Sequence, residues 1–171
     1  MNRLCPLKNE FNIIYIIILA TLCSGCGNVK HTEPKTAIHA NAMRAQLLSA
    51  CGSHTVNLLD ESYWSPSEKW INAAITDYCV SRRSSRTWSL RWDCNKQTRD
   101  AQTFLARRYA QSSTDRDPEG VAAFLQAYHK PGGGGHSVLA ILVDGRTWKY
   151  FDAMNGAWNT ETQRAVWYSG D

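Results

Sequence analysis

Apolar residues recur at helical spacing in three stretches of this chain. The first stretch covers residues 37–50. The second covers residues 65–79, where Ser65 can cap the helix ahead of a proline in its first turn. The third covers residues 93–111, and Asp93 can cap its first turn. The pattern therefore predicts three helices in the first two thirds of the chain.

Beyond residue 130 the pattern changes to that of strands. Residues 137–143 are continuously apolar, as in a strand buried on both faces, and residues 147–151 alternate. Asp144-Gly145 lies between them and is a strong hairpin signal. Residues 121–128 fit either a short helix or a strand. We expect an α+β domain in which helices precede an antiparallel sheet.

The N-terminal segment has a pattern of its own. Arg3 and Lys8 precede an apolar run over residues 13–22. This run of about ten residues is shorter than the roughly 20 that a membrane-spanning helix needs. It therefore predicts a signal peptide over residues 1–25.

Cys26 follows this run directly, in Leu22-Cys23-Ser24-Gly25-Cys26. The segment resembles a bacterial lipobox, which implies cleavage before Cys26 and attachment of lipid to its sulfur. An asparagine at position 28 then favours the outer membrane, facing the periplasm. We expect a lipidated tether over residues 26–45 and one domain over residues 46–171. The alternatives are an ordinary secretory signal and a retained anchor.

Composition narrows the range of partners. The net charge is +4, and the basic residues are dispersed rather than gathered in one stripe, so nucleic acid is not an expected partner. Seven tryptophans in 171 residues is a high content. Some can line a groove for peptide or sugar, although most are expected in the core.

Three cysteines remain after the signal peptide and Cys26 are set aside: Cys51, Cys79 and Cys94. In an oxidising compartment two of the three are expected to pair. A disulfide between Cys51 and Cys79 leaves the thiol of Cys94 available for chemistry. The alternative pairs Cys79 with Cys94 and makes both structural.

Cys94, His136 and Asp152 are the candidate catalytic residues. Cys94 begins a predicted helix, where the helix dipole and free backbone amides favour the thiolate. His136 opens the apolar strand, and Asp152 ends the returning strand. A histidine beside a cysteine can take its proton, and a carboxylate can orient the imidazole.

The hairpin turn decides which polar residue shares the face of His136. A type I turn closed by Gly145 places Asp152 directly across from His136. A two-residue loop moves Asp152 to the opposite face and puts Asn155 on the face of His136 instead. We favour Asp152 as the orienting residue and keep Asn155 as the alternative.

Three motifs in this order resemble those of transglutaminase-like, papain-fold cysteine proteinases of bacteria and phages: Trp92-Asp93-Cys94, His136-Ser137-Val138 and Tyr150-Phe151-Asp152. The resemblance covers residues 60–156. It implies an α+β fold in which the helix carrying Cys94 packs on an antiparallel sheet carrying His136 and Asp152.

The same resemblance implies a membrane-anchored cysteine peptidase, amidase or acyl transferase that acts on an amide bond. The Cys94 thiolate would attack the carbonyl carbon, and the backbone N–H of Cys94 would bind the oxyanion, with Asn57 as the candidate side-chain donor. The expected substrate is a peptide or a peptidoglycan stem, and no cofactor is expected.

Other function classes stay open at this point. His54, His129 and His136 with Cys94 contain no closely spaced ligand pair, so no metal site is expected. One alternative is a catalytically inactive envelope lipoprotein that binds a protein or cell-wall partner. Another is an envelope protein whose interface is an apolar patch around Trp64, Trp88 and Trp158.

Overall fold

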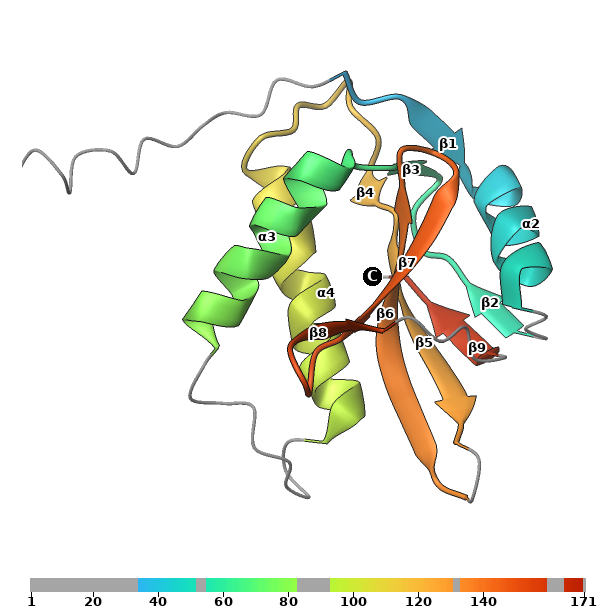
Figure 1. Ribbon diagram of the computed structural model, residues 1–171. Coiled ribbons are helices and arrows are strands. Elements are labelled where there is room, and N and C mark those ends of the chain that lie inside the picture. The colour runs from blue at the N-terminus through green and yellow to red at the C-terminus, as the bar shows by residue number, and fades with distance from the viewer. Residues whose placement is uncertain (1–33, 52–54, 83–92, 131–132, 160–164, 171) are drawn as a thin grey trace, which may run out of the picture. The chain divides into compact units, whose positions relative to one another are not determined.

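A computed structural model describes residues 34–51, 55–82, 93–130, 133–159 and 165–170 (Figure 1). The signal peptide and lipidated Cys26 predicted above lie outside these residues, as do His54 and Trp88. Within the described part of the chain, no helix has the length and apolar character needed to cross a membrane.

The described residues form two sheets, and the larger one has six strands in the order β2-β9-β5-β6-β7-β8. Its β2–β9 pair is parallel, and its other pairs are antiparallel. The strands are β2 (Thr55–Asn57), β5 (Ala123–His129), β6 (Gly135–Val143), β7 (Thr147–Asp152), β8 (Ala157–Asn159) and β9 (Ala165–Ser169).

The smaller sheet has three short strands in the order β1-β3-β4. They are β1 (Ala37–His39), β3 (Ser62–Trp64) and β4 (Gly120–Val121). The β1–β3 pair is antiparallel and the β3–β4 pair is parallel. A hydrogen bond of 2.8 Å from Ala122 N–H to the Trp64 carbonyl continues the contact beyond β4.

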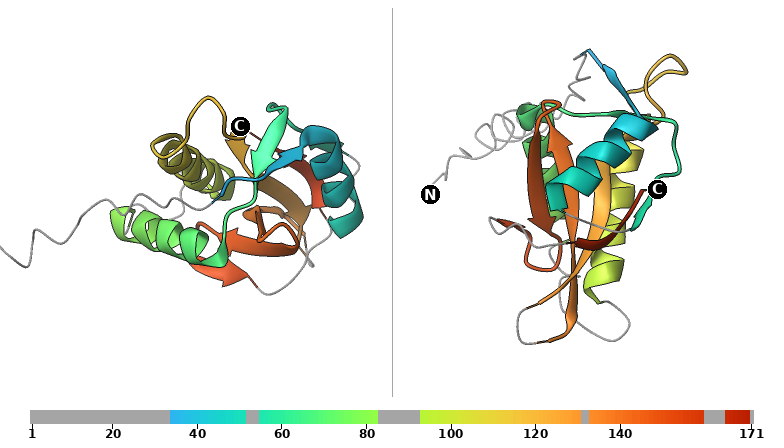
Figure 2. Two further views of the ribbon diagram at one scale, coloured as in Figure 1. Left: turned by 90° about the horizontal axis from the view of Figure 1, so that it is seen from above. Right: turned by 90° about the vertical axis from the view of Figure 1, so that its right-hand side faces the viewer.

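Three helices cover the two faces of the larger sheet: α2 (Ala40–Cys51), α3 (Glu68–Ser81) and α4 (Cys94–Ala110). Alternate residues of β6 point to opposite faces. Leu139, Ile141 and Val143 join the core formed with α3 and α4, whereas Val138, Ala140 and Leu142 join the core formed with α2. Figure 2 shows α2 on the side of the sheet opposite to α3 and α4.

Local sequence rules account for most of these elements. The third predicted helix is confirmed, because α4 begins at Cys94 with the Asp93 side chain as its N-cap. The second predicted helix is also present, but its N-cap is Ser67. Ser65 instead donates a 2.8 Å hydrogen bond to the Leu142 carbonyl and accepts one of 2.8 Å from Gly145 N–H, which ties it to the hairpin.

The N-terminal part of the domain begins earlier than the sequence predicted. Residues 34–45, which we expected to belong to a tether, enter the fold. Residues 37–39, which we expected to be helical, form β1, and α2 starts at Ala40. The Ala40 N–H donates a 2.9 Å hydrogen bond to the Glu61 carbonyl, so a tertiary contact overrides the helical pattern here.

The expected architecture also differs from the observed one. The resemblance implied a single helix-covered antiparallel sheet, whereas the strands here divide between two sheets with two parallel pairs. Strands β1, β2 and β3 have three residues each. Such short strands carry almost no periodic signal, so their pairing depends on tertiary contacts that the sequence pattern does not reveal.

The N-cap of α4 gives a direct test of this local structure. Asp93→Ala removes the acceptor of a 3.0 Å hydrogen bond from Lys96 N–H. The free energy of unfolding, measured by denaturant titration, should fall by about 1 kcal/mol. Asp115→Ala changes an exposed carboxylate outside the helix and should stay within about 0.5 kcal/mol of wild type. Equal losses in the two variants would contradict the capping role.

Candidate functional site

His136 and Asp152 form a buried pair between neighbouring strands. His136 Nε2 lies 3.0 Å from Asp152 Oδ2, and both residues are buried. The Tyr128 ring packs edge-on against the His136 ring, with 5.6 Å between centroids. The contact links β6 to the end of β7 and is shielded from water on the side of Tyr128.

Asp152 also organises the turn that follows it. Its Oδ1 accepts hydrogen bonds from the N–H groups of Met154 (3.0 Å) and Asn155 (3.3 Å). The Asn155 side-chain amide donates a 2.7 Å hydrogen bond to Oδ2. Burial alone would raise the pKa of Asp152, but the contacts with His136 and the two backbone N–H groups lower it below its usual value. The carboxylate is therefore held in its ionised form.

The register of this hairpin differs from both alternatives considered above. Leu139 pairs with Phe151 and Val143 with Thr147, so Asp152 is not directly opposite His136. The turn has positive φ at Asp144 (53°) and Gly145 (70°), as in a type I′ turn. His136 and Asp152 nevertheless share a face as diagonal neighbours, and Asn155 contacts Asp152 rather than replacing it.

Cys94 does not join this pair in the structure. It is the first residue of α4 and is half-buried, and within the described residues it makes no disulfide and no hydrogen bond to His136. One contact between α4 and β6 is a hydrogen bond between the hydroxyl groups of Thr98 and Ser137, which lie 3.2 Å apart. Because side chains alternate along β6, Ser137 faces α4 and His136 faces the opposite side.

The other predicted site residues lie apart from this pair. Asn57 is an exposed residue of β2, and β9 and β5 separate that strand from β6. The Cys79 thiol donates a hydrogen bond of 3.8 Å to the Gly156 carbonyl. The side chain of Cys51 lies outside the described residues, so the Cys51–Cys79 disulfide stays a prediction. Trp64, expected in an exposed patch, is 2% exposed and belongs to the core.

Among the described residues, no three side chains of histidine, cysteine, aspartate or glutamate are grouped so that they could hold a metal ion.

A pocket of about 400 Å³ opens between α4 and strands β3, β4 and β5. This volume lies in the range of small-molecule sites, about 300–1,000 Å³. Its walls combine apolar residues with charged and aromatic ones, among them Asp60, Tyr63, Arg107, Tyr109, Glu119 and Val121. Burial raises the pKa of Tyr63 and of Tyr109, so both phenols stay protonated. No sequence pattern indicates this pocket, because its residues come from three separate stretches of the chain, 60–63, 102–113 and 119–123.

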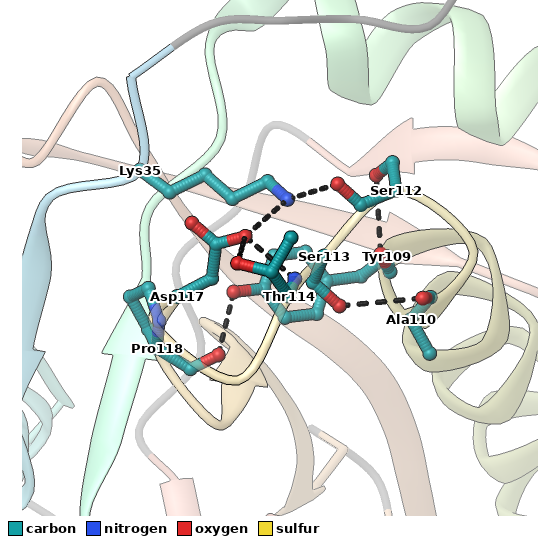
Figure 3. A network of polar contacts seen from close by, with 8 residues as sticks. All are labelled: Lys35, Tyr109, Ala110, Ser112, Ser113, Thr114, Asp117 and Pro118. Atoms are coloured by element: carbon teal, nitrogen blue, oxygen red, sulfur yellow. Dashed lines mark hydrogen bonds and ion pairs between the residues drawn. The ribbon is translucent and has the colours of Figure 1, made fainter.

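A buried lysine braces one wall of this pocket (Figure 3). The Lys35 side chain is 5% exposed, donates to the Ser112 carbonyl and lies 3.2 Å from Asp117 Oδ2. Its ammonium group also lies 4.9 Å from the centre of the Tyr109 ring. Asp117 accepts a 2.8 Å hydrogen bond from Thr114 N–H. These contacts fix the loop between α4 and β4, which carries Ser113 and Glu119 into the pocket wall.

Two solved structures share the fold of this chain. One is described as a PSL1a-E64 complex, with a TM-score of 0.65 and 16% identity, covering 78% of this chain and 51% of that chain. The other is Polyporus squamosus lectin bound to the human-type influenza-binding epitope Neu5Aca2-6Galb1-4GlcNAc, with a TM-score of 0.63 and 16% identity, covering 78% and 49%. The chain therefore spans about half the length of these structures, and the likeness concerns the fold. No family model and no curated protein matches the sequence.

These neighbours overturn the predicted fold class and activity. Neither is described as a transglutaminase-like or papain-like protein, and one is described as a lectin. The papain-like fold class is therefore wrong, and so is the cysteine peptidase, amidase or acyl transferase built on it. The motifs misled because each has a structural explanation. Asp93-Cys94 starts a capped helix, and His136 and Asp152 join two strands.

The depressed pKa of Asp152 predicts a pH-dependent stability. Its folded-state pKa lies below the unfolded value of about 3.9, so the contribution of the carboxylate is present above that value and is lost as the pH falls through the folded pKa. Asp152→Asn should lower the free energy of unfolding at pH 7 by about 1–3 kcal/mol, measured by denaturant titration.

The loss should shrink as the pH falls below about 3.9, because the unfolded wild-type chain then binds a proton at this carboxyl group more readily than the folded chain does. Asp115→Asn, at an exposed position, serves as the control and should follow wild type at every pH. A loss in Asp152→Asn that stays constant between pH 7 and pH 3 would contradict an ionised Asp152 in the folded protein.

Proposed function

We propose that this chain is a non-catalytic envelope protein that binds a carbohydrate partner of the cell wall. The observation that carries the proposal is the fold shared with Polyporus squamosus lectin, whose structure contains a bound saccharide, over 78% of this chain. The same structural likeness favours a binding protein, which the sequence analysis kept as the alternative, over a cysteine enzyme.

The pocket beside α4 supplies the features that a saccharide site needs. Sugars present apolar C–H faces and several hydroxyl groups, and their sites combine aromatic surface with planar polar side chains. Asp60 and Arg107 contribute polar groups to the lining, and Tyr63 and Tyr109, which are 1% and 2% exposed, back its apolar part.

Attachment to a membrane is the second part of the proposal. The N-terminal apolar run followed by Cys26 supports an anchor on the outer membrane, facing the periplasm. A lipid-anchored binding protein in that compartment would have peptidoglycan within its reach.

Binding of the purified full chain to saccharides tests the proposed function. Isothermal titration with soluble glycan fragments released from peptidoglycan should give a dissociation constant between about 1 μM and 1 mM. There are two controls. One is the same set of fragments after their glycosidic bonds have been hydrolysed, and the other is the heat-unfolded chain. Binding of the peptide stems alone, with no binding of glycan, would overturn the proposal.

The anchor has a separate test. Cys26→Ser should prevent incorporation of labelled palmitate and move the chain from the membrane fraction to the soluble fraction after expression in a bacterium. Cys23→Ser, three residues earlier in the predicted signal, should keep both the label and the membrane fraction. Membrane recovery of Cys26→Ser equal to that of wild type would contradict lipidation at this residue.

A further inference from the structure

Arg107 is the exposed cation on the rim of the pocket. It lies in the last turn of α4 and lines the pocket wall. Within the described part of the chain, its guanidinium group makes no hydrogen bond or ion pair. Its neighbour Arg108 differs, because that side chain forms an ion pair with Asp77. Arg107 therefore presents its donors to solvent and to whatever enters the pocket.

The chemistry of a guanidinium group narrows the choice of ligand. Arginine carries five N–H donors in a planar fork, which matches the two oxygens of a carboxylate. Such paired, charge-assisted hydrogen bonds are stronger than those between neutral groups. A carboxylate on the ligand is thus the group that Arg107 would recognise best.

The pocket lining also carries two acceptors, the carboxylates of Asp60 and Glu119. Glu119 Oε2 already accepts a 2.7 Å hydrogen bond from Glu61 N–H, which holds that carboxylate in place. The Asp60 carboxylate lies over Gly120, and a Cβ atom built on this glycine would lie 2.3 Å from Asp60 Oδ2. Glycine at position 120 is therefore what allows Asp60 to occupy the wall. Fixed carboxylates of this kind accept hydrogen bonds from hydroxyl groups and repel a ligand carboxylate, which orients an acidic sugar toward Arg107.

Two parts of the pocket lining are held by a common brace. Tyr109, two residues after Arg107, donates a 2.6 Å hydrogen bond to the Pro118 carbonyl, next to Glu119. Lys35 binds the loop between these residues through Ser112 and Asp117. The end of α4 and the loop before Glu119 are thus held together before a ligand arrives, which lowers the entropic cost of binding.

We infer that this pocket binds a saccharide bearing a carboxylate, with the carboxylate on Arg107 and the ring hydroxyls toward Asp60. The inference rests on the proposed function and adds the place of binding and the chemical class of the sugar.

N-acetylmuramic acid and N-acetylglucosamine are a matched pair of probes, because they differ by a lactyl ether that carries a carboxylate. The full chain should bind the acidic sugar about ten- to hundredfold more tightly at pH 7, measured by titration calorimetry or ligand-observed NMR. Arg107→Gln should remove this preference, so that the two sugars bind with affinities within about twofold of each other. Added salt should weaken the binding of the acidic sugar alone.

Two further variants separate the pocket from general effects of charge. Arg116→Gln removes the same charge from an exposed loop position outside the pocket and should leave the preference unchanged. Gly120→Ala displaces the Asp60 carboxylate and should weaken both sugars. Circular dichroism and the unfolding midpoint of each variant establish that it is folded.

Equal binding of the two sugars by wild type, or an unchanged preference in Arg107→Gln, would overturn the inference. If the chain then still binds larger glycan fragments, the proposed function stands and the assignment of this pocket fails. If the chain binds no saccharide at all, both fail together.

Discussion

The fold depends on one strand that must be buried on both of its faces. Strand β6 is continuously apolar from Val138 to Val143, and each of these residues is at most 1% exposed. Its odd-numbered residues need α3 and α4 on one side, and its even-numbered residues need α2 on the other. Each buried side chain of this size contributes about 1.5–3 kcal/mol relative to exposure, so both helical layers are required for the sheet.

This constraint explains which parts of the fold the sequence predicts. The double burial of β6 and the cap of α4 are encoded locally, by an unbroken apolar run and by Asp93. The positions of helices α3 and α4 follow from apolar residues at helical spacing after a capping side chain. In contrast, β2 pairs with β9 across most of the chain length, through strands too short to carry a periodic signal. The resemblance of three short motifs to cysteine proteinases could not supply that missing information.

The candidate site shows the same division between local and tertiary information. The proximity of His136 and Asp152 was predictable, because a hairpin joins their strands and any even register keeps them on one face. Whether Cys94 meets them was not predictable, because it depends on which face of β6 receives α4. The contact of Thr98 with Ser137 answers that question by placing α4 on the face away from His136. The pocket was also hidden, since its residues come from segments that only the fold brings together.

Lys35 connects the start of the domain with the wall of the pocket. A buried ammonium group is costly unless it is paired, and here a carboxylate, a carbonyl and an aromatic ring surround it. The same contacts tie the start of the described domain to the loop between α4 and β4, which carries Ser113 and Glu119 into the pocket lining.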